Sequence, residues 1–409
     1  MKQVFALLAL LLAAIVPAAA QPPAKTVGPP LLILLSIDGF RADYLDRGLT
    51  PTLALLAKTG VRALGMRPSF PTLTFPNHYT LVTGLVPDHH GIVDNDMWDR
   101  AIGQKFTMSA KTGGDARWWE GAKPLWVSAA EQGRITADAG WPGDTVAIFG
   151  KRPTYLDPWR NDRPAAEAVM MSLHWLDLPA AYRPSLQFLY FYEVDHAGHD
   201  FGPDSPEVNA ALRKVDAAVA TLVAGLKARG IFDRVNLVIT ADHGMIATPP
   251  EQFTVIDTLV PPALGIVRTA VSLAGIDPKP GHDAELARIL LAPHPHFTCW
   301  RKAALPPAFH YGSNARVPQF VCLNEPGWRF RTRDETEHDK NRNLGNHGYD
   351  PRDPRMAAIF LGHGPAFGRG VTLPVFDNVD VYPLLAKITG LTPAPNDGSL
   401  AVIGLGLKH

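Results

Sequence analysis

The sequence predicts an α/β fold in which a mainly parallel central sheet is covered by helices on both faces. Three observations lead to this prediction. Unbroken apolar runs, such as LLILLSI at 31–37, are typical of strands that are buried on both faces. These runs alternate with segments that read as helices, which is the order of βαβ units. At 409 residues, 46% of them hydrophobic, the chain is long and apolar enough to bury such a sheet.

The expected elements follow one another along the chain. We expect strands at the apolar runs 31–37, 144–150, 186–192, 235–240 and 356–362. The helices expected between and after them are 51–59, 123–132, 207–229 and 380–389. From about 250 to 340 prolines multiply and short strand-like pieces replace long helices, which predicts a smaller inserted or capping region. Ligands of such a fold bind at the carboxyl ends of the parallel strands.

The N-terminus has the pattern of a secretory signal. Residues 1–20 contain one lysine, an apolar stretch and then small residues that end in an Ala-x-Ala form. The apolar stretch is shorter than the roughly 20 residues of a membrane span, although an uncleaved anchor is the alternative. A proline-rich tether over 21–30 leads into the domain over 31–409. We therefore expect a periplasmic or secreted protein whose mature chain has no membrane span.

Charge and cysteine content restrict the partners. The 39 basic and 39 acidic residues balance, so no overall field attracts a nucleic-acid polymer or an anionic membrane. A small-molecule partner is expected, and the sequence gives no indication of the oligomeric state. Cys299 and Cys322 are the two cysteines of the chain, and in an oxidising compartment we expect them to pair. Two buried free thiols are the alternative.

Carboxylates and imidazoles gather where the expected strands end. Three such groups follow strands in SIDGF, EVDHAGHD and TADHGM, and a fourth precedes the last strand in GNHGYD. Each residue alone has an ordinary alternative as a cap, turn or loop residue. Together they supply three Asp and three His, a set that suits two zinc ions with open positions for a substrate. The six are Asp38, Asp195, His199, Asp242, His243 and His347.

The remaining histidines carry no claim to the metal sites. His78, in TFPNHY, has no role that the sequence explains. The histidines expected on the surface or in loops are His89, His90, His294, His296, His310 and His338.

The motifs SIDGF, TFPNHYTLVTGLVPDHHGIVDN, DHAGH, ADHGM and NHGYD occur in this order, and with them the chain resembles the nucleotide pyrophosphatase/phosphodiesterases of the alkaline phosphatase superfamily. The resemblance runs from about 31 to 395 and implies an alkaline phosphatase-like fold. It also implies one metal site formed by Asp195, His199 and His347. A second site is implied to consist of Asp38, Asp242 and His243, with Thr74 as a further ligand and as the nucleophile.

Thr74 has two readings. From its position alone it is a packing residue, or it caps a helix that we expect to open at Pro76 and Asn77. If zinc holds its hydroxyl, Thr74 can attack phosphorus and form a phospho-threonine intermediate. The N–H groups of such a helix end would also face a phosphate. Asn95 matches the family asparagine that donates to a non-bridging phosphate oxygen, and a turn residue is its alternative.

The substrate is expected to be a phosphodiester. Phe75 and Tyr190 match positions between which relatives stack a nucleobase, and Tyr155 is a further candidate contact. Core aromatics are the alternative for both stacking residues. The resulting expectation is hydrolysis of nucleotide diester and pyrophosphate bonds to nucleoside 5′-monophosphates. Two alternatives stay open: a choline or glycerol phosphodiesterase on the same scaffold, and a zinc-binding protein without catalysis.

Overall fold

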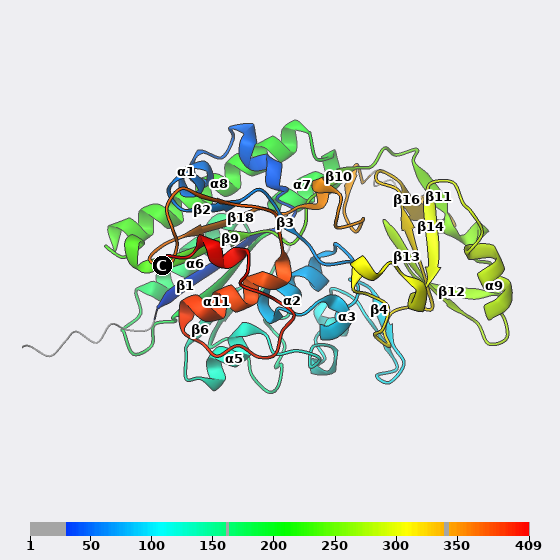
Figure 1. Cartoon of the computed structure of the whole chain (residues 1–409), viewed down its shortest axis with the longest axis horizontal. Helices are drawn as coiled ribbons and strands as arrows, with labels where there is room; N and C mark the ends of the chain where they lie inside the picture. Colours follow the sequence, from blue (N-terminus) through cyan, green and yellow to red (C-terminus); the bar gives the residue numbers. More distant parts are fainter. Residues whose placement is uncertain (1–29, 161–162, 339–342, 409) are drawn as a thin grey trace, which may run out of the picture.

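The computed structural model describes residues 30–160, 163–338 and 343–408. The expected signal over 1–20 and the tether over 21–30, except for Pro30, lie outside the described residues. An eight-stranded sheet runs through the larger part of the molecule (Figure 1). In spatial order it consists of β19 (Val371–Leu373), β2 (Val61–Ala63), β18 (Phe360–His363), β9 (Val235–Thr240), β1 (Leu31–Ile37), β8 (Leu186–Phe191), β6 (Thr136–Ala139) and β7 (Tyr155–Asp157).

The sheet is mainly parallel, as predicted. The strands β9, β1, β8, β6 and β7 all pair in parallel, and β19 pairs in parallel with β2. One strand, β18, runs antiparallel to both of its neighbours. All six residues of β8 and of β9 are buried, because helices cover both faces of the sheet.

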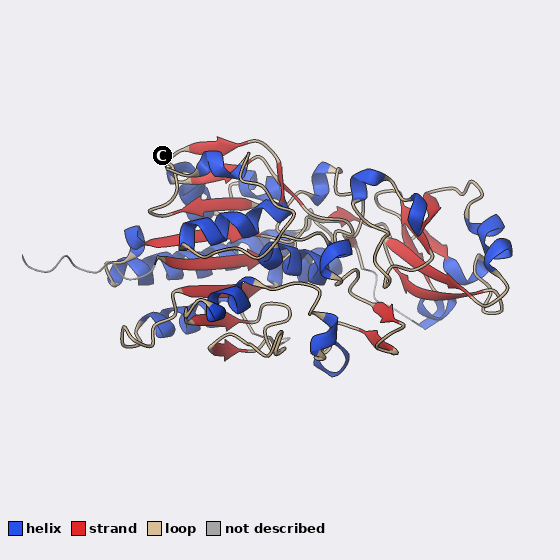
Figure 2. Cartoon of the chain, turned by 60° about the horizontal axis from the view of Figure 1, so that its bottom comes forward, coloured by secondary structure: helices blue, strands red, loops and turns tan. Residues whose placement is uncertain are grey.

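Helices lie on both sides of the sheet (Figures 1 and 2). On one side α1 (Pro51–Thr59) and α6 (Ala165–Leu176) pack against α8 (Pro206–Ala228). On the other side α2 (Thr74–Thr83) packs against α11 (Val381–Thr389). The remaining α-helices of the described residues are α3 (Pro87–His90), α4 (Ala110–Gly113), α5 (Leu125–Glu131), α7 (Glu193–Phe201), α9 (Asp283–Leu290) and α10 (Arg333–His338).

The longest helix, α8, shows why these segments are helical. The hydroxyl of Ser205 accepts the N–H of Val208, and Pro206 occupies the first turn, where its missing N–H has no intrahelical partner. Apolar residues then recur at helical spacing and face the core. They include Val208, Leu212, Val215, Val219, Leu222 and Leu226, all of which are buried.

One expected strand is wrong and another is displaced. The segment 144–150 forms turns, in which the N–H of Asp144 donates to the carbonyl of Trp141 at 3.0 Å, and the strand of this region is β6. The apolar run misled because Val146 and Ile148 are buried although they lie in a loop and not in a strand of the sheet. The last strand begins at Phe360 and not at 356, since Met356 ends a short 3₁₀ turn.

The region expected as an insert contains a separate antiparallel sheet, at the right of Figure 1. Its four strands lie in the order β12 (Gly265–Ala270), β13 (Leu273–Pro278), β15 (Phe320–Asn324) and β14 (Phe297–Arg301). Helix α9 packs on this sheet, and the helix and the sheet together form an apolar cluster separate from the main core. Cys299 and Cys322 lie directly opposite each other on β14 and β15 and form the expected disulfide.

The remaining strands of the described residues form short pairs. They are β3 (Met66–Arg67) with β20 (Phe376–Asp377), β4 (Met97–Asp99) with β5 (Gln104–Phe106), β10 (Ile246–Ala247) with β17 (Gly345–Asn346), and β11 (Phe253–Val255) with β16 (Arg329–Arg331).

A buried carboxylate anchors the insert to the larger part. Asp88, on α3, accepts the backbone N–H groups of Gly312 at 3.0 Å, Ser313 at 2.9 Å and Asn314 at 2.9 Å. It also accepts the hydroxyl of Ser313 at 2.5 Å. Burial alone would raise the pKa of Asp88, but the hydrogen bonds from Ser313, Asn314 and Gly312 outweigh burial and lower this pKa.

Replacing Asp88 by alanine is expected to lower the free energy of unfolding by about 3 kcal/mol, because several donors lose a charged acceptor. Since the pKa of Asp88 is lowered in the folded protein, its contribution is complete above the ordinary carboxyl pKa of about 4. The contribution is lost as the pH falls through the lowered value. Urea unfolding of wild type and Asp88→Ala at several pH values measures this.

The matched control for that prediction is Asp115→Ala. Asp115 is a partly exposed carboxylate that accepts the side chain and the backbone N–H of nearby Arg117. Its removal is expected to cost much less, because exposed ion pairs contribute little. Equal losses for the two variants would contradict the anchoring role of Asp88.

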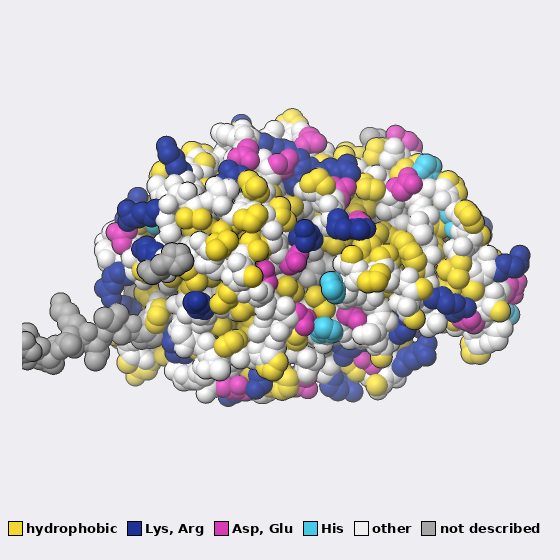
Figure 3. Space-filling view, in the orientation of Figure 1, with side chains coloured by type: hydrophobic (Ala, Val, Ile, Leu, Met, Phe, Trp, Pro, Cys, Tyr) yellow, Lys and Arg dark blue, Asp and Glu magenta, His cyan; other side chains and the backbone are white. Residues whose placement is uncertain are grey.

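The surface carries charges of both signs. On the face shown in Figure 3, basic and acidic side chains alternate without a large area of one sign, in line with the balanced composition. Among the described residues, no helix combines the length and apolar character needed to cross a membrane.

Candidate active site

The sheet topology brings the acidic strand ends together. Asp38 follows β1, Asp242 follows β9, and Asp195 lies in the first turn of α7, directly after β8. Because β1 pairs in parallel with both β8 and β9, the three carboxylates meet at one edge of the sheet. Gly39 permits the close approach: it has a φ of 66°, and a Cβ there would lie 3.0 Å from the Cα of Asp195.

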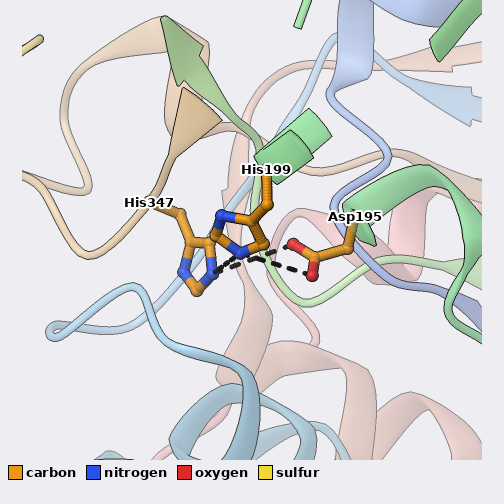
Figure 4. Close-up of side chains that lie close together, drawn as sticks. All are labelled: Asp195, His199 and His347. Carbon is orange, nitrogen blue, oxygen red and sulfur yellow. Dashed lines mark hydrogen bonds and ion pairs between the residues drawn. The ribbon is translucent and has the colours of Figure 1, made fainter. Parts of the chain in front are cut away.

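Asp195, His199 and His347 point toward one another, as Figure 4 shows. Asp195 and His199 are four residues apart on α7 and therefore share one face of the helix. The Nε2 atom of His199 lies 3.4 Å from Asp195 Oδ2 and 3.2 Å from the Nε2 atom of His347. His347 Nε2 lies 3.7 Å from Asp195 Oδ1. The sequence predicted this group of three, which is compact enough to hold a metal ion.

The second expected group lies beside the first. The Nε2 atom of His243 is 2.9 Å from Asp242 Oδ2 and 3.6 Å from Asp38 Oδ1. The rings of His243 and His347 stack with their centroids 3.5 Å apart, so the two groups are contiguous. The atoms group in more than one way: Asp38 also forms compact sets with Asp195 and His243, and with His78 and Asp242.

The three imidazoles are oriented so that Nε2 of each is free to bind a cation. In each ring Nδ1 lies within hydrogen-bond distance of a backbone carbonyl, which can only accept, so Nδ1 carries the proton. The acceptors are the carbonyls of Gly345 for His199 at 2.8 Å, of Thr72 for His347 at 2.9 Å and of Gly244 for His243 at 3.0 Å. The Nε2 atoms then face carboxylate oxygens and one another, an arrangement that a cation stabilises.

As in the imidazoles, one atom of the Asp38 and Asp242 carboxylates is engaged in a hydrogen bond and the other is available to a cation. Asp38 Oδ2 accepts the hydroxyl of Tyr190, and Asp242 Oδ1 accepts the N–H of Gly39 at 3.2 Å. Asp38 Oδ1, Asp242 Oδ2 and Asp195 Oδ1 are buried and have no hydrogen-bond partner among the described residues. Buried oxygens without a partner are rare in proteins. The donor set, carboxylate and imidazole in a closed group, therefore fits a metal such as zinc.

The buried charges shift the pKa values of the group in both directions: those of Asp38 and His243 are raised, and that of His347 is lowered. Burial, together with the charges of Asp242 and Asp195, raises the pKa of Asp38 well above its usual range. Burial also lowers the pKa of His347, and the neighbouring His243 lowers it further. A cation at this place would favour the charged carboxylate and the neutral imidazole, which are the forms that ligate metals.

Thr74 is the first residue of α2, so the helix opens two residues earlier than we expected. Pro76 falls within the first turn, where an N–H would have no intrahelical acceptor. The hydroxyl Oγ1 of Thr74 lies 3.3 Å from His243 Nε2. Asn95 accepts the backbone N–H of Phe75 at 3.0 Å through Oδ1. This bond turns the NH₂ end of the Asn95 side chain away from the helix.

A cavity of about 360 Å³ opens above these residues. Its floor includes Thr74, Asp38, Asp195, His199 and His347, and Asn95 also lines it. Most of its wall is apolar and aromatic, and among the described residues it has no Lys or Arg. The aromatic lining consists of Phe75, Trp119, Trp141, Trp159 and Tyr190.

The structure places two of the expected substrate contacts in the cavity wall and leaves the third out of it. Phe75 and Tyr190 both line the cavity, although the hydroxyl of Tyr190 is engaged by Asp38. Tyr155 is not among the lining residues, and its hydroxyl donates to the carbonyl of Tyr182 at 2.9 Å. Trp159, which is 41% exposed, lines the cavity instead, and sequence reasoning missed it. An aromatic residue in a polar loop shortly after Tyr155 was the available signal.

The structure buries two histidines, His90 and His78, that the sequence did not predict to be buried. His90 was expected on the surface or in a loop but is fully buried, and its Nε2 atom lies 3.1 Å from the carbonyl of Pro76. His78, which the sequence left unexplained, is fully buried directly behind Thr74. The side chain of His338 lies outside the part of the chain that the structure describes.

Comparison with known proteins agrees with this geometry. The family model described as type I phosphodiesterase / nucleotide pyrophosphatase matches residues 32–350. An uncharacterised pyrophosphatase/phosphodiesterase of Schizosaccharomyces pombe is 37% identical over 380 residues, which are 90% of this chain and 78% of the relative. Human ectonucleotide pyrophosphatase/phosphodiesterase family member 1 is 35% identical over 95% of this chain, which spans 43% of that protein's length.

A solved structure extends the likeness to the fold. Murine ectonucleotide pyrophosphatase/phosphodiesterase 5, solved as an inactive threonine-to-alanine variant in complex with AMP, is 34% identical with a TM-score of 0.87. The match covers 93% of this chain and all of that one. The chain therefore has an alkaline phosphatase-like fold and belongs to the type I phosphodiesterase / nucleotide pyrophosphatase family.

Proposed function

We propose that this chain is a secreted or periplasmic, two-zinc enzyme that hydrolyses nucleotide diester and pyrophosphate bonds and releases nucleoside 5′-monophosphates. One observation carries the proposal: the hydroxyl of Thr74 lies between a group of carboxylates and imidazoles and an aromatic cavity. The names of the relatives and the AMP bound to the murine structure support nucleotides as the substrate class. The disulfide and the extracellular relatives support the location.

In this proposal Asp195, His199 and His347 hold one zinc ion. Asp38, Asp242 and His243 hold the other, with Thr74 as its fourth ligand. When bound, zinc lowers the pKa of a coordinated hydroxyl or water and neutralises charge on phosphoryl oxygens. The orientation of the imidazoles by backbone carbonyls supports this assignment, because it leaves each Nε2 lone pair available.

Thr74 supplies the nucleophile. The hydroxyl proton of Thr74 passes to solvent, Oγ1 forms a bond to phosphorus, and the bond from phosphorus to the leaving oxygen breaks, after which the leaving oxygen takes up a proton from solvent. The oxygen of a water molecule then forms a bond to phosphorus while the bond between phosphorus and Oγ1 breaks, and a proton lost by the water restores the hydroxyl of Thr74 as the monophosphate leaves. Asn95 donates from its NH₂ group to a non-bridging oxygen, and the bond from Phe75 N–H to its Oδ1 orients it for this.

The aromatic wall receives the nucleobase. Phe75 and Tyr190 provide faces for stacking, and Trp159 adds a third at the exposed side of the cavity. Stacking on aromatic side chains accepts every base, so broad nucleotide use follows. Tyr155 has no part in this, since its hydroxyl is bonded outside the cavity.

A substrate panel tests the proposal. Purified protein is expected to cleave ATP and dinucleoside polyphosphates with release of nucleoside 5′-monophosphate, and to act weakly on lysophosphatidylcholine and glycerophosphocholine. Cleavage of the choline esters without any cleavage of nucleotides would favour the lipid headgroup alternative. Absence of all hydrolysis in the zinc-loaded protein would favour a binding protein.

Replacing Tyr190 by phenylalanine tests the metal assignment. The ring stays, but Asp38 loses the hydroxyl that orients its carboxylate. Removal of such an orienting partner commonly weakens metal binding by roughly 10–100-fold, and we expect a loss in that range. Competition with a chromogenic chelator measures it. Tyr155→Phe is the control, and equal zinc affinity in all three proteins would contradict the role of Tyr190.

A further inference from the structure

His78 is buried directly behind the proposed nucleophile. It lies four residues after Thr74 on α2, and its side chain has no exposed surface. Its Nδ1 atom is 2.9 Å from the backbone carbonyl oxygen of Thr74, and its Nε2 atom is 2.9 Å from the hydroxyl of Ser36 on β1. Both ring nitrogens are therefore engaged, one by the helix and one by the central sheet.

The chemistry of the partners sets the direction of these bonds. A carbonyl oxygen can only accept, so Nδ1 carries a proton and donates to Thr74. This holds for the neutral and for the charged ring alike. A hydroxyl can donate or accept, so Ser36 suits either form of Nε2. Of the two bonds, only the one to the carbonyl of Thr74 requires that His78 be the donor.

The contacts of His78 extend to the rest of the site. Nδ1 is 3.4 Å from Oδ2 of Asp242, so the same N–H edge faces a proposed zinc ligand. The ring packs edge-on against Tyr190, with centroids 5.2 Å apart, and against Trp141, with centroids 5.1 Å apart. The indole N–H of Trp141 in turn donates to the carbonyl of His78 at 3.2 Å.

From these contacts we infer that His78 is a positioning residue, which holds the first turn of α2 so that the hydroxyl of Thr74 faces the metal group. The inference rests on the proposed role of Thr74. Leu73, the residue before the helix, provides no side-chain cap, and the first turn is held from outside: Asn95 accepts the N–H of Phe75, and His78 donates to the carbonyl of Thr74. Placement matters, since an error of about 1 Å in a reacting group can cost roughly 100-fold in rate.

Two conservative variants separate this role from simple packing. Asparagine carries an amide N–H₂ near the place of Nδ1, so His78→Asn can still donate to Thr74. The longer glutamine reaches toward the place of Nε2, so His78→Gln can bond to Ser36 but leaves the carbonyl of Thr74 without its donor. Both variants are polar, and asparagine, the smaller one, loses more packing against Tyr190 and Trp141, so packing alone would predict the larger defect for His78→Asn.

We expect His78→Asn to keep kcat within about five-fold of wild type and His78→Gln to lose roughly 100-fold. In both, KM, the dissociation constant of AMP and the zinc content are expected to stay within about three-fold, because the cavity and the ligands remain. The split between kcat and KM, together with rescue by asparagine, distinguishes positioning from loss of stability.

Thr83→Val is the matched control, because its hydroxyl also donates to a carbonyl four residues earlier, that of Tyr79 at 2.6 Å, at the far end of α2. Its kcat is expected to be unchanged. Equal kcat for His78→Asn and His78→Gln would overturn the inference, as would a variant at His78 that cannot fold, since that would assign a structural role. If Thr74→Ala were fully active, the proposed function itself would fail. If it were inactive and His78→Gln fully active, only the inference would fail.

Discussion

Replacing Thr74 by alanine is expected to lower kcat for nucleotide hydrolysis by roughly 10³-fold or more, because removal of a covalent nucleophile leaves only binding and electrostatic stabilisation. The zinc content is expected to stay at two per chain, since each proposed site keeps three other ligands. Turnover with a chromogenic nucleotide ester and zinc content by atomic emission measure the two quantities in the same preparation.

Thr74→Ser is the control for this prediction. It keeps a hydroxyl at the first residue of α2, so we expect turnover well above that of the alanine variant. AMP is expected to bind to Thr74→Ala, because the aromatic cavity is unaffected and the lost group is small. Unchanged turnover in Thr74→Ala at full zinc content would remove Thr74 from its proposed role.

Removal of metal is expected to abolish hydrolysis and to lower the thermal midpoint. Without a cation, Asp38, Asp195 and Asp242 are buried close together with oxygens that have no hydrogen-bond partner. Dialysis against a chelator followed by calorimetry and activity measurement tests both effects. Zinc is expected to restore them and magnesium is not, because imidazole ligands suit zinc and magnesium prefers oxygen and water.

Asp195→Asn provides the comparison for metal removal. It loses a charged ligand from the group with His199 and His347, so it is expected to hold about one zinc ion fewer than wild type. Its thermal midpoint should then respond less to the chelator. Full activity of the wild type after exhaustive chelation, with zinc shown to be absent, would contradict a metal-dependent reaction.

The grouping of the proposed metal ligands could be predicted from the sequence because strand ends and spacing define it. A carboxylate directly after each of the runs 31–37 and 235–240, and another shortly after 186–192, must lie at the same sheet edge if the strands are parallel and adjacent. The pair Asp195 and His199 is also local, one helical turn apart on α7. The structure adds the carbonyl partners of the imidazoles, which have no sequence signal because any residue has a carbonyl.

The cavity wall could not be predicted in the same way. The segment 140–146 lines the cavity, yet part of it lies in a run that the sequence indicated as a strand. Hydrophobicity reports burial, and Val146 is buried, but it does not report whether a segment pairs with a strand or packs as a loop. Trp159 was missed for a related reason: it lies in a loop, and nothing local indicates which way a loop folds.

His78 shows why the role of a single buried polar residue is difficult to predict from the sequence. Within TFPNHY it has helical spacing to Thr74, which the sequence could have revealed if the helix had been placed two residues earlier. Its bond to Ser36, 42 positions away, depends on how α2 packs on β1 and has no local signature. Such long-range contacts follow from the assembled sheet rather than from any motif.

The stereochemical course at phosphorus tests the central claim, a covalent intermediate on Thr74, most directly. The substrate is a nucleotide phosphorothioate diester of one configuration, hydrolysed in water labelled with a heavy oxygen isotope, and the configuration of the product is read by phosphorus NMR. Attack by Thr74 followed by attack by water inverts phosphorus twice, so net retention is expected. Net inversion would mean that water attacks the substrate directly, and it would contradict Thr74 as the nucleophile.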